Sequence, residues 1–430
     1  MDNNFGLRRG RLKVKLLYGE EHVEVRIRDE NLMAVLRGSR PPDSQNEIGE
    51  VKLSLENPIA GGFRRGSKAL LLVTDYTRPT PLKTMLPPIF DRLRRLGYRE
   101  FTVLVANGLH EPASKELLEE FLGSEVFEYA EVVNHDVSKR DELTYVGETS
   151  MGTPLWVNSR LFEADLRVGC GVVEPHFFAG YGGGGKIILP GVSGEETVYK
   201  NHSYAMIAHP KARLGVLDGN PVYSDICEAA SMARLDAVVN VVLGSGRGVS
   251  RCFTGRPIET HRAAVDFLDK FIRVKVEAMA DIAVVSGGGY PADRNLYQAV
   301  KGMAVGELIV KPRGVIVLMA ECRDGVAHEH FYRLVSRFDD PSSLLEYIRE
   351  HEPIRDQWEA QIMARILQKH KIIVYAKGVN RHVSERMMLI PASSPEEAME
   401  IAFNIAGKDA KTVVVPEGTH IIPDVSSKAK

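Results

Sequence analysis

The sequence predicts an α/β protein of two domains, each built on a largely parallel β-sheet. Short continuous apolar runs, typical of buried strands, alternate along the chain with segments of helical spacing. The chain has 430 residues, which exceeds one ordinary core and favours two domains. Several apolar runs are followed directly by polar, potentially reactive residues, as at the ligand-binding edge of an open α/β sheet.

The composition is that of a soluble globular protein, with 44% hydrophobic and 26% charged residues. A net charge of -2 gives no reason to expect nucleic acid or a membrane as a partner. No apolar run approaches the ~18 residues that span a bilayer, and the first residues lack the apolar region of a signal peptide. The 4 cysteines stand far apart without a CxxC pair, which suits reduced thiols. We therefore expect a cytoplasmic protein.

The first elements in chain order are a hairpin and two strands that enclose a helix. Residues 11–36 alternate charged and apolar side chains, the period-2 pattern of a half-exposed hairpin. Residues 69–74 (ALLLVT) and 101–106 (FTVLVA) are expected to be buried strands, with helical spacing from 82 to 97 between them. The notable residues after these two strands are Asp75, Tyr76, Thr77 and Arg78, and then His110.

The stretch from 174 to 202, EPHFFAGYGGGGKIILPGVSGEETVYKNH, follows a third apolar run and contains His176, Lys186 and His202. Its four consecutive glycines, 182–185, lose much backbone entropy on folding, so we expect backbone there to approach another group closely. The carboxyl ends of the strands in such a sheet share one edge. The reactive residues after all three strands are therefore expected to meet at one site.

The second half of the chain continues the alternation of strands and helices. A turn, a helix and a strand follow His202, and a helix follows Gly255. A strand at 278–286 then leads through Gly287, Gly288 and Gly289 into a helix, on which Tyr297 and Lys301 share a face, with Gln298 beside them. We place the domain boundary near 274. The predicted domains are residues 1–273 and 274–430, with the last segment allowed to pack back on the first domain.

Each candidate residue also has an ordinary interpretation when it is taken alone. Asp75 can be a turn aspartate, Arg78 a surface arginine, and His110 a loop histidine with local hydrogen bonds. Three strand ends that all carry such residues make these interpretations less attractive together than separately.

Three other kinds of site match parts of the sequence: a P-loop, a dehydrogenase glycine motif and a hydrolytic metal site. Residues 180–186 satisfy GxxxxGK, but Ile187 stands where a P-loop requires Ser or Thr, so nucleotide binding of that type is disfavoured. The three glycines at 287–289 are a weak dehydrogenase signal without GxGxxG spacing. A hydrolytic metal held by His110, His176 and His202 lacks an HExxH motif or an acidic cluster.

The motifs DYTRPTP, NGLHEP, PHFFAGYGGGGK, ILPG, NH and YQAVK together resemble the nickel-dependent lactate racemase family over nearly the whole chain. The resemblance implies two α/β domains with the active site in the cleft between them. It implies a nickel-pincer nucleotide, Ni(II)-pyridinium-3,5-bisthiocarboxylic acid mononucleotide, supplied by cofactor-synthesis enzymes. It also implies a small 2-hydroxy acid as substrate, lactate or a related compound.

The resemblance further implies roles for individual residues. Lys186 is tethered to the cofactor through a thioamide, and His202 ligates nickel. His110 and His176 are alternating acid/base groups. The cofactor or substrate is contacted by Asp75, Tyr76, Thr77 and Arg78, and the substrate is held by Arg78, Tyr297, Gln298 and Lys301. Tyr76 departs from the histidine frequent in the family, which leaves the identity of the substrate open.

The residue types suit this isomerase chemistry. Removing the C2 hydrogen of a 2-hydroxy acid as hydride leaves a planar keto acid, and one base is needed for each enantiomer, hence two histidines. Arg78 and Lys301 can bind a carboxylate, and an imidazole with sulfur donors suits nickel. The alternative from another class is a protein that binds or carries the nickel cofactor without catalysis, although a carrier needs no acid/base pair.

Overall fold

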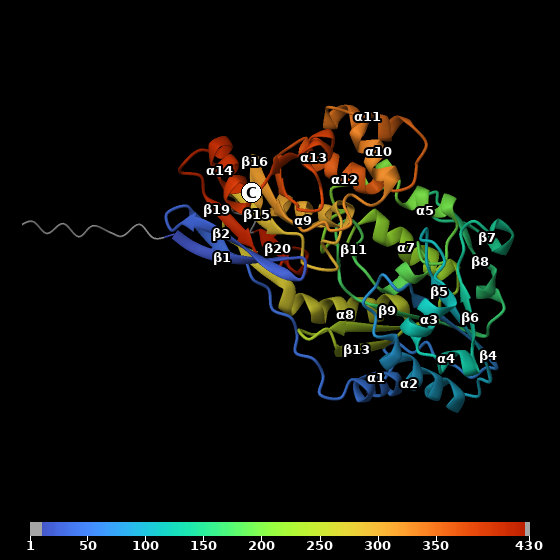
Figure 1. The fold of residues 1–430 in the computed structure, drawn as a ribbon. Coiled ribbons are helices and arrows are strands. Elements are labelled where there is room, and N and C mark those ends of the chain that lie inside the picture. The colour runs from blue at the N-terminus through green and yellow to red at the C-terminus, as the bar shows by residue number, and fades with distance from the viewer. Residues whose placement is uncertain (1–10, 426–430) are drawn as a thin grey trace, which may run out of the picture. The chain divides into compact units, whose positions relative to one another are not determined.

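The computed structural model describes residues 11–425, which divide into two compact units. One unit comprises residues 39–271, and the other joins residues 11–38 to residues 272–425. Each unit is an α/β structure with a mostly parallel sheet, so the predicted fold class is confirmed (Figure 1).

The unit of residues 39–271 contains the three strands that precede the predicted site. Its elements are α1 (Glu47–Glu56), β4 (Lys68–Thr74), α2 (Leu82–Arg95), β5 (Glu100–Ala106), α3 (Lys115–Leu122), α4 (Val126–Tyr129), β6 (Glu131–Asn134), η1 (Arg140–Glu142), β7 (Leu143–Glu148), β8 (Pro154–Asn158), η2 (Ser159–Phe162), β9 (Leu166–Val172), β10 (Pro175–His176), β11 (Gly180–Tyr181), η3 (Gly184–Ile187), α5 (Glu195–Asn201), α6 (Tyr204–Ala208), α7 (Pro221–Met232), β12 (Ala237–Leu243), β13 (Val249–Gly255) and α8 (Pro257–Ile272).

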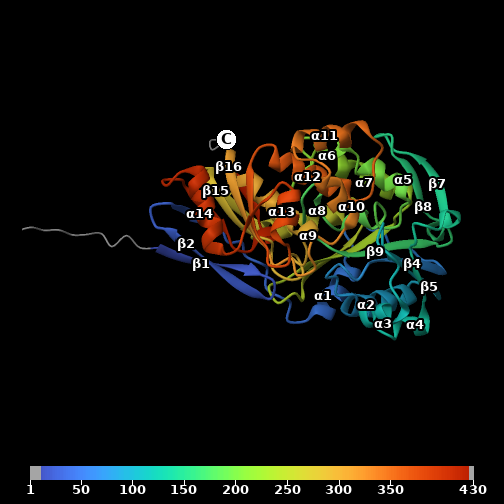
Figure 2. The same cartoon turned by 45° about the horizontal axis from the view of Figure 1, so that its top comes forward.

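The main sheet of this unit has the strand order β13-β12-β9-β4-β5-β6. Its strand pairs are parallel except for β12 with β13, which is antiparallel at the edge. Helices α1–α4 cover one face, and α5, α7 and α8 lie on the other (Figure 2). Leu71 and Val73 of β4 join the core with α1–α4, while Gly169 of β9 lies against Ile187 of η3. The continuous apolar run predicted for β4 is therefore explained by helices on both faces.

The second unit has the same kind of sheet with the order β18-β17-β16-β15-β19-β3, all of it parallel. Its elements are β1 (Arg11–Tyr18), β2 (Glu21–Arg28), β3 (Leu32–Val35), β14 (Arg273–Val276), β15 (Ala280–Ser286), α9 (Leu296–Ile309), β16 (Val310–Met319), α10 (Glu329–Ser336), α11 (Pro341–Glu350), α12 (Gln357–Leu367), β17 (Lys371–Tyr375), α13 (Arg381–Arg386), β18 (Ile390–Ala392), α14 (Pro395–Ala406), β19 (Thr412–Val415), η4 (Gly418–His420) and β20 (Ile422–Val425).

One face of this sheet carries α14 and the β1–β2 hairpin, whose apolar side chains share a core with β15, β16 and β17 (Figure 1). The other face carries α9, which packs on β15 and β16. The expected hairpin at the start of the chain is thus present, as are the expected strands at 69–74, 101–106 and 278–286 and the helix from 82.

The division of the chain differs from the predicted one at both ends. Residues 11–38, predicted to belong to the first domain, pack with the C-terminal half, because the apolar face of the hairpin covers its sheet and β3 pairs with β19. The last described strand, β20, pairs with β14 of the same unit. The unit boundary at 271/272 lies close to the predicted boundary at 273/274.

Candidate functional site

The candidate site residues of the 39–271 unit lie where its strand order reverses. The chain proceeds from β4 to β5 and β6 on one side and later places β9 and β12 on the other side of β4. The loops after β4 and β9 therefore flank a topological switch point, the position where open α/β sheets bind ligands. Asp75 follows β4, His110 follows β5, and the 174–202 stretch follows β9. The sheet order thus brings the three strand ends together at one edge.

Asp75 and His110 make direct contact at this edge. The Asp75 carboxylate is buried, and its Oδ2 lies 2.6 Å from Nδ1 of His110. The hydroxyl of Thr77 donates to its other oxygen over 2.7 Å. A carboxylate can only accept, so Nδ1 of His110 carries the hydrogen. In the neutral ring this leaves the lone pair of Nε2 available as a base.

The charge state of Asp75 supports this assignment. Burial alone would raise the pKa of the carboxyl group, but the hydrogen bond and charge of His110, the charge of Arg78 and the Thr77 hydroxyl outweigh burial and lower it. Asp75 is consequently ionised at neutral pH, and it can stabilise an imidazolium at His110 when that ring takes up a proton.

Arg78 connects the loop after β4 with the loop after β9. Its guanidinium lies 3.8 Å from the carboxylate of Glu174, two residues before His176, and both side chains are about two-fifths exposed, at 39% and 40%. Such an exposed ion pair contributes little stability, and it leaves Arg78 accessible to an anionic ligand. The neighbouring Tyr76 is 44% exposed.

His176 has the opposite ring arrangement to His110. The backbone N–H of Ala179 donates to Nδ1 of His176 over 3.3 Å, so in the neutral ring the hydrogen is on Nε2. The ring packs against Phe177 and Phe178, with centroid distances of 5.1 Å and 4.5 Å. In its neutral form His176 therefore presents a hydrogen-bond donor at Nε2, where His110 presents an acceptor.

Two other predicted site residues, His202 and Lys186, lie near the ring of Phe178. Its ring meets His202 edge-on with a centroid distance of 5.0 Å, and Nζ of Lys186 lies 5.8 Å from the centroid of the same ring. Phe178 is 2% exposed. The place of Phe178 in the site could not be predicted from the sequence, because an apolar side chain carries no chemical signal. It stands only two residues after His176.

His202 directly follows α5 and is buried. Burial first, and then the charge of Lys186, lower its pKa to about 3, so the imidazole is neutral at neutral pH. A neutral imidazole is the form that binds a metal ion.

The glycines at 182–185 lie where other parts of the protein come close to the loop backbone. Space for a side chain at these positions is taken by the protein itself: a Cβ on Gly183 would lie 2.9 Å from Val173, one on Gly184 2.8 Å from His261, and one on Gly185 3.0 Å from Ala230. The close approach expected of the backbone at these glycines is therefore present, and it is made to other parts of the protein. They allow the loop to pack tightly between β9, α7 and α8.

The backbone of this loop also disfavours a P-loop. The N–H of Gly182 donates to the carbonyl of Glu174 over 2.7 Å, and the N–H of Gly184 donates to Oδ1 of Asn240 over 2.9 Å. The N–H of Lys186 donates to the carbonyl of Gly183, and the following element is a short 3-10 turn. A phosphate cradle needs such N–H groups to point at the ligand.

The remaining predicted residues belong to the other unit and begin α9. The amine of Lys301 donates to Oε1 of Gln298 over 2.6 Å. Tyr297 is 9% exposed, and its ring stacks on His328 with a centroid distance of 3.8 Å. Its oxygen accepts from Nε1 of Trp358 over 3.0 Å. α9 follows β15, next to which the strand order of this second sheet also reverses.

A buried carboxyl group near Lys301 was not found from the sequence. Glu359 is 1% exposed, and burial raises its pKa to about 8, although the charge of Lys301 acts in the opposite direction. A lone glutamate on a helix carries no signal of this kind, because its burial depends on the elements packed around α12.

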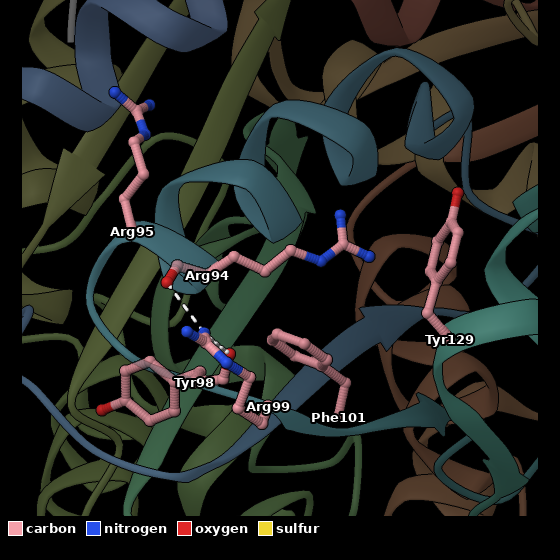
Figure 3. Close-up of a pocket in the computed structure, with 6 residues that line it drawn as sticks. All are labelled: Arg94, Arg95, Tyr98, Arg99, Phe101 and Tyr129. Atoms are coloured by element: carbon pink, nitrogen blue, oxygen red, sulfur yellow. Dashed lines mark hydrogen bonds between the residues drawn. The ribbon is translucent and has the colours of Figure 1, made fainter.

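A cavity of about 530 Å³ lies elsewhere in the 39–271 unit (Figure 3). Its lining residues are Arg94, Arg95, Tyr98, Arg99, Phe101 and Tyr129. Arg94 lies over the ring of Tyr129, and Arg99 donates to the carbonyls of Arg94 and Tyr98. Phe101 is at the amino end of β5, whereas His110 follows the carboxyl end, so this cavity is separate from the predicted site.

Within residues 11–425, no three side chains of His, Cys, Asp or Glu converge as a metal-binding group. No helix in this part of the chain is long and apolar enough to cross a membrane. The cysteines at 170, 227, 252 and 322 are all free thiols.

Comparison with known proteins identifies the family. The family models described as Lactate racemase N-terminal domain and Lactate racemase C-terminal domain match residues 18–215 and 275–423. A lactate racemase of Thermoanaerobacterium thermosaccharolyticum is 36% identical over 422 residues, covering 95% of this chain and 98% of that protein. A lactate racemase of Lactiplantibacillus plantarum is 34% identical over 421 residues, covering 95% and 99%.

Solved structures agree with the sequence comparisons. The lactate racemase apoprotein from T. thermosaccharolyticum matches with a TM-score of 0.92 and 34% identity, over 96% of this chain and all (100%) of that one. A crystal structure of a Thermotoga maritima protein matches with a TM-score of 0.67 at 18% identity over 91% of this chain, which shows a shared fold. The chain therefore belongs to the lactate racemase family of isomerases.

Proposed function

We propose that this isomerase interconverts the stereoisomers of a 2-hydroxy acid, lactate or a related compound, by reversible hydride transfer to a nickel-pincer nucleotide. The observation that carries the proposal is the opposite arrangement of two histidines at one sheet edge. In their neutral forms His110 offers a lone pair at Nε2, because its Nδ1 donates to Asp75, and His176 offers an N–H. A reaction that inverts C2 needs one such group for each enantiomer.

The residues around Phe178 are suited to the proposed cofactor. His202 supplies one neutral nitrogen donor in an apolar setting, and no protein metal-binding group of three surrounds it among the described residues. A metal that arrives already held by sulfur arms fits a site with one imidazole. The amine of Lys186 lies 5.8 Å from the centroid of the same Phe178 ring, and we propose that it holds the cofactor.

The two histidines divide the proton transfers between them. His110 takes the hydroxyl proton of one enantiomer, and the buried Asp75 carboxylate stabilises the imidazolium that forms. A bound cofactor would supply the acceptor and donor of hydride at C2, so that a planar keto acid could be reduced on either face. His176, in its imidazolium form, donates the proton at Nε2 to the alkoxide of the other enantiomer and becomes neutral, and the roles reverse in the opposite direction.

The substrate carboxylate needs a cationic partner. Arg78 is accessible at the same sheet edge, where it makes an exposed ion pair with Glu174, and a guanidinium binds a carboxylate in a two-point geometry. Roles for Tyr76, Thr77, Tyr297, Gln298 and Lys301 in binding cofactor or substrate remain predictions from the family resemblance, as does supply of the cofactor by synthesis enzymes. A cytoplasmic location likewise remains a prediction.

The proposal is tested with single-enantiomer 2-hydroxy acids and protein prepared with the cofactor-synthesis enzymes. Chiral chromatography should show conversion of at least one acid toward the racemate or the epimeric mixture. With substrate deuterated at C2, the product should keep deuterium, because hydride held on a cofactor does not exchange with water. Washout of the label would show proton abstraction at C2 and contradict the hydride mechanism. A loaded protein without any conversion would favour the cofactor carrier.

A further inference from the structure

His261 is a buried histidine of α8 that the proposed reaction does not use. Its side chain is 2% exposed, yet both ring nitrogens have partners within the same unit. Nε2 lies 2.9 Å from the carbonyl oxygen of Gly182, and Nδ1 lies 3.3 Å from the hydroxyl of Tyr223. The carbonyl can only accept, so Nε2 carries the hydrogen and Nδ1 accepts from Tyr223.

The protonation states of both partners support these directions. Burial lowers the pKa of His261 to about 4, which keeps the ring neutral at neutral pH. Burial likewise raises the pKa of Tyr223, so its hydroxyl keeps the hydrogen that it donates. The ring can therefore make both hydrogen bonds at once, as one donor and one acceptor.

The same ring fixes the glycine run by packing. Gly184 has a φ of +56°, and a Cβ there would lie 2.8 Å from Cγ of His261. On the other side, Oδ1 of Asn240 accepts from the N–H of Gly184 over 2.9 Å. The loop is thus held by two side chains, from α8 and β12, that are distant from it in sequence.

Lys186 is the next residue after this loop, and its position depends on the loop backbone. The N–H of Lys186 donates to the carbonyl of Gly183 over 3.2 Å, inside the stretch that His261 and Asn240 hold. If the carbonyl of Gly182 or the backbone of Gly184 shifted, the Cα and Cβ atoms of Lys186 would move with it.

We infer that His261 is a positioning residue for Lys186: it fixes the glycine loop so that the Lys186 amine faces the ring of Phe178. An isolated buried histidine often serves only to fill a core and satisfy its own hydrogen bonds. Here the hydrogen bond, the packing contact and the glycine conformation all act on the segment that leads into Lys186. The importance of this position for catalysis rests on the proposed function, but the position itself does not.

The first test measures the Lys186 amine in cofactor-free, full-length protein. Trace acetylation followed by peptide mass spectrometry gives the labelling rate of Lys186 relative to the exposed Lys200. His261→Leu should change this ratio by about threefold or more, because it removes the hydrogen bond to the carbonyl of Gly182 and the one from the hydroxyl of Tyr223. His261→Gln retains an N–H toward Gly182 and should keep the ratio near that of the unaltered protein.

The control is His370→Leu, which alters a buried histidine of the other unit and should lower stability without changing the ratio. An unchanged ratio in His261→Leu overturns the inference, and so does an equal change in His370→Leu. Cofactor-loaded His261→Leu should then show kcat reduced about tenfold or more, with recovery in His261→Gln. An undiminished kcat would also overturn the inference. Failure of the unaltered protein to convert any 2-hydroxy acid would contradict the proposed function, while the labelling ratio would still decide this point.

Discussion

Asp75 has no direct place in the proton transfers, but it determines which nitrogen of His110 can act. Its carboxylate accepts from Nδ1 at 2.6 Å and is nearly inaccessible to solvent, with 4% of its side chain exposed. The hydrogen bond both orients the ring and leaves Nε2 free in the neutral form. Asp75, Thr77 and His110 therefore form one hydrogen-bonded group, in which Asp75 accepts from both of the others.

We expect Asp75→Asn to lower kcat by ~10²–10⁴-fold, the range for loss of one acid/base group. The amide can donate to Nδ1 of His110, which would put the ring hydrogen on Nε2 and remove the base. Single-turnover oxidation of each enantiomer should show one direction affected more than the other. Thr77→Val is the matched control, because it removes only the hydroxyl that donates to Asp75, and it should cost less than about tenfold. Equal rates in Asp75→Asn and the unaltered protein would contradict the assignment.

At the scale of elements, the loop from Gly182 to Lys186 shows how a glycine run can serve internal packing. The N–H groups of Gly182, Gly184 and Lys186 donate to protein acceptors, and the Cβ positions of three glycines point at β9, α7 or α8. The run therefore allows a strand end, a buried histidine and a 3-10 turn to lie very close together. Lys186 begins where this packing ends.

Gly184→Ala should destabilise the 39–271 unit by roughly 2–4 kcal/mol, from a positive φ together with a contact of 2.8 Å against His261. Gly61→Ala provides the control, because Gly61 has a φ of +81° but nothing within 4 Å of its Cβ, so only the backbone cost of about 1–2 kcal/mol applies.

Chemical denaturation of both variants gives the free energies of unfolding. Adding His261→Ala to Gly184→Ala should relieve part of the clash, so the double variant should be more stable than the sum of the two single effects. Additive costs would mean that the two residues do not interact.

At the scale of the whole molecule, the two units repeat one arrangement. In each sheet the strand order reverses beside a central strand, β4 in one and β15 in the other, and the predicted site residues follow these strands. The residues predicted to bind ligands in both units are thereby placed at carboxyl ends of parallel strands, where side chains from several loops can converge. The family assignment covers both units.

Buried neutral histidines make the stability of the 39–271 unit sensitive to acid. Burial lowers the pKa of His135, and it lowers that of His261 to about 4, against about 6.5 in an unfolded chain. Between these values the unfolded chain binds more protons than the folded one, so the free energy of unfolding falls as the pH falls. Their stabilising effect is complete above pH ~6.5, and His261 alone loses roughly 3 kcal/mol by pH 4.

We expect His261→Gln to reduce the difference in the free energy of unfolding between pH 7.5 and pH 4.5 by roughly 2–3 kcal/mol. The chain has 2 tryptophans, so in a Trp358→Phe background the fluorescence of Trp156 reports this unit alone. An identical pH dependence in both proteins would show that His261 is not kept neutral by burial. The Asp75 carboxyl, whose pKa is lowered instead, loses its contribution only at more acidic pH.

The sequence by itself determined the strands and helices that carry the site, and the chemistry-bearing residues at their ends. Apolar periodicity is a local property, so the strand at 69–74, the helix from 82 and the hairpin at the start could be predicted without knowing their neighbours. Placing reactive side chains after strands needed only the parallel-sheet rule, which predicted that Asp75 and His110 share an edge.

Only the tertiary structure decided which elements and side chains pack against one another. Residues 11–38 belong to the C-terminal unit because its sheet offers an apolar face to the hairpin. The alternating pattern of the hairpin predicts an apolar face but does not say which sheet that face will cover. The packing role of the glycines depends on His261, a residue about 80 positions away that approaches only when α8 covers the sheet. Likewise, the tautomers of His110 and His176 follow from contacts with Asp75 and Ala179, which exist only once β4, β5 and the loop after β9 are in place.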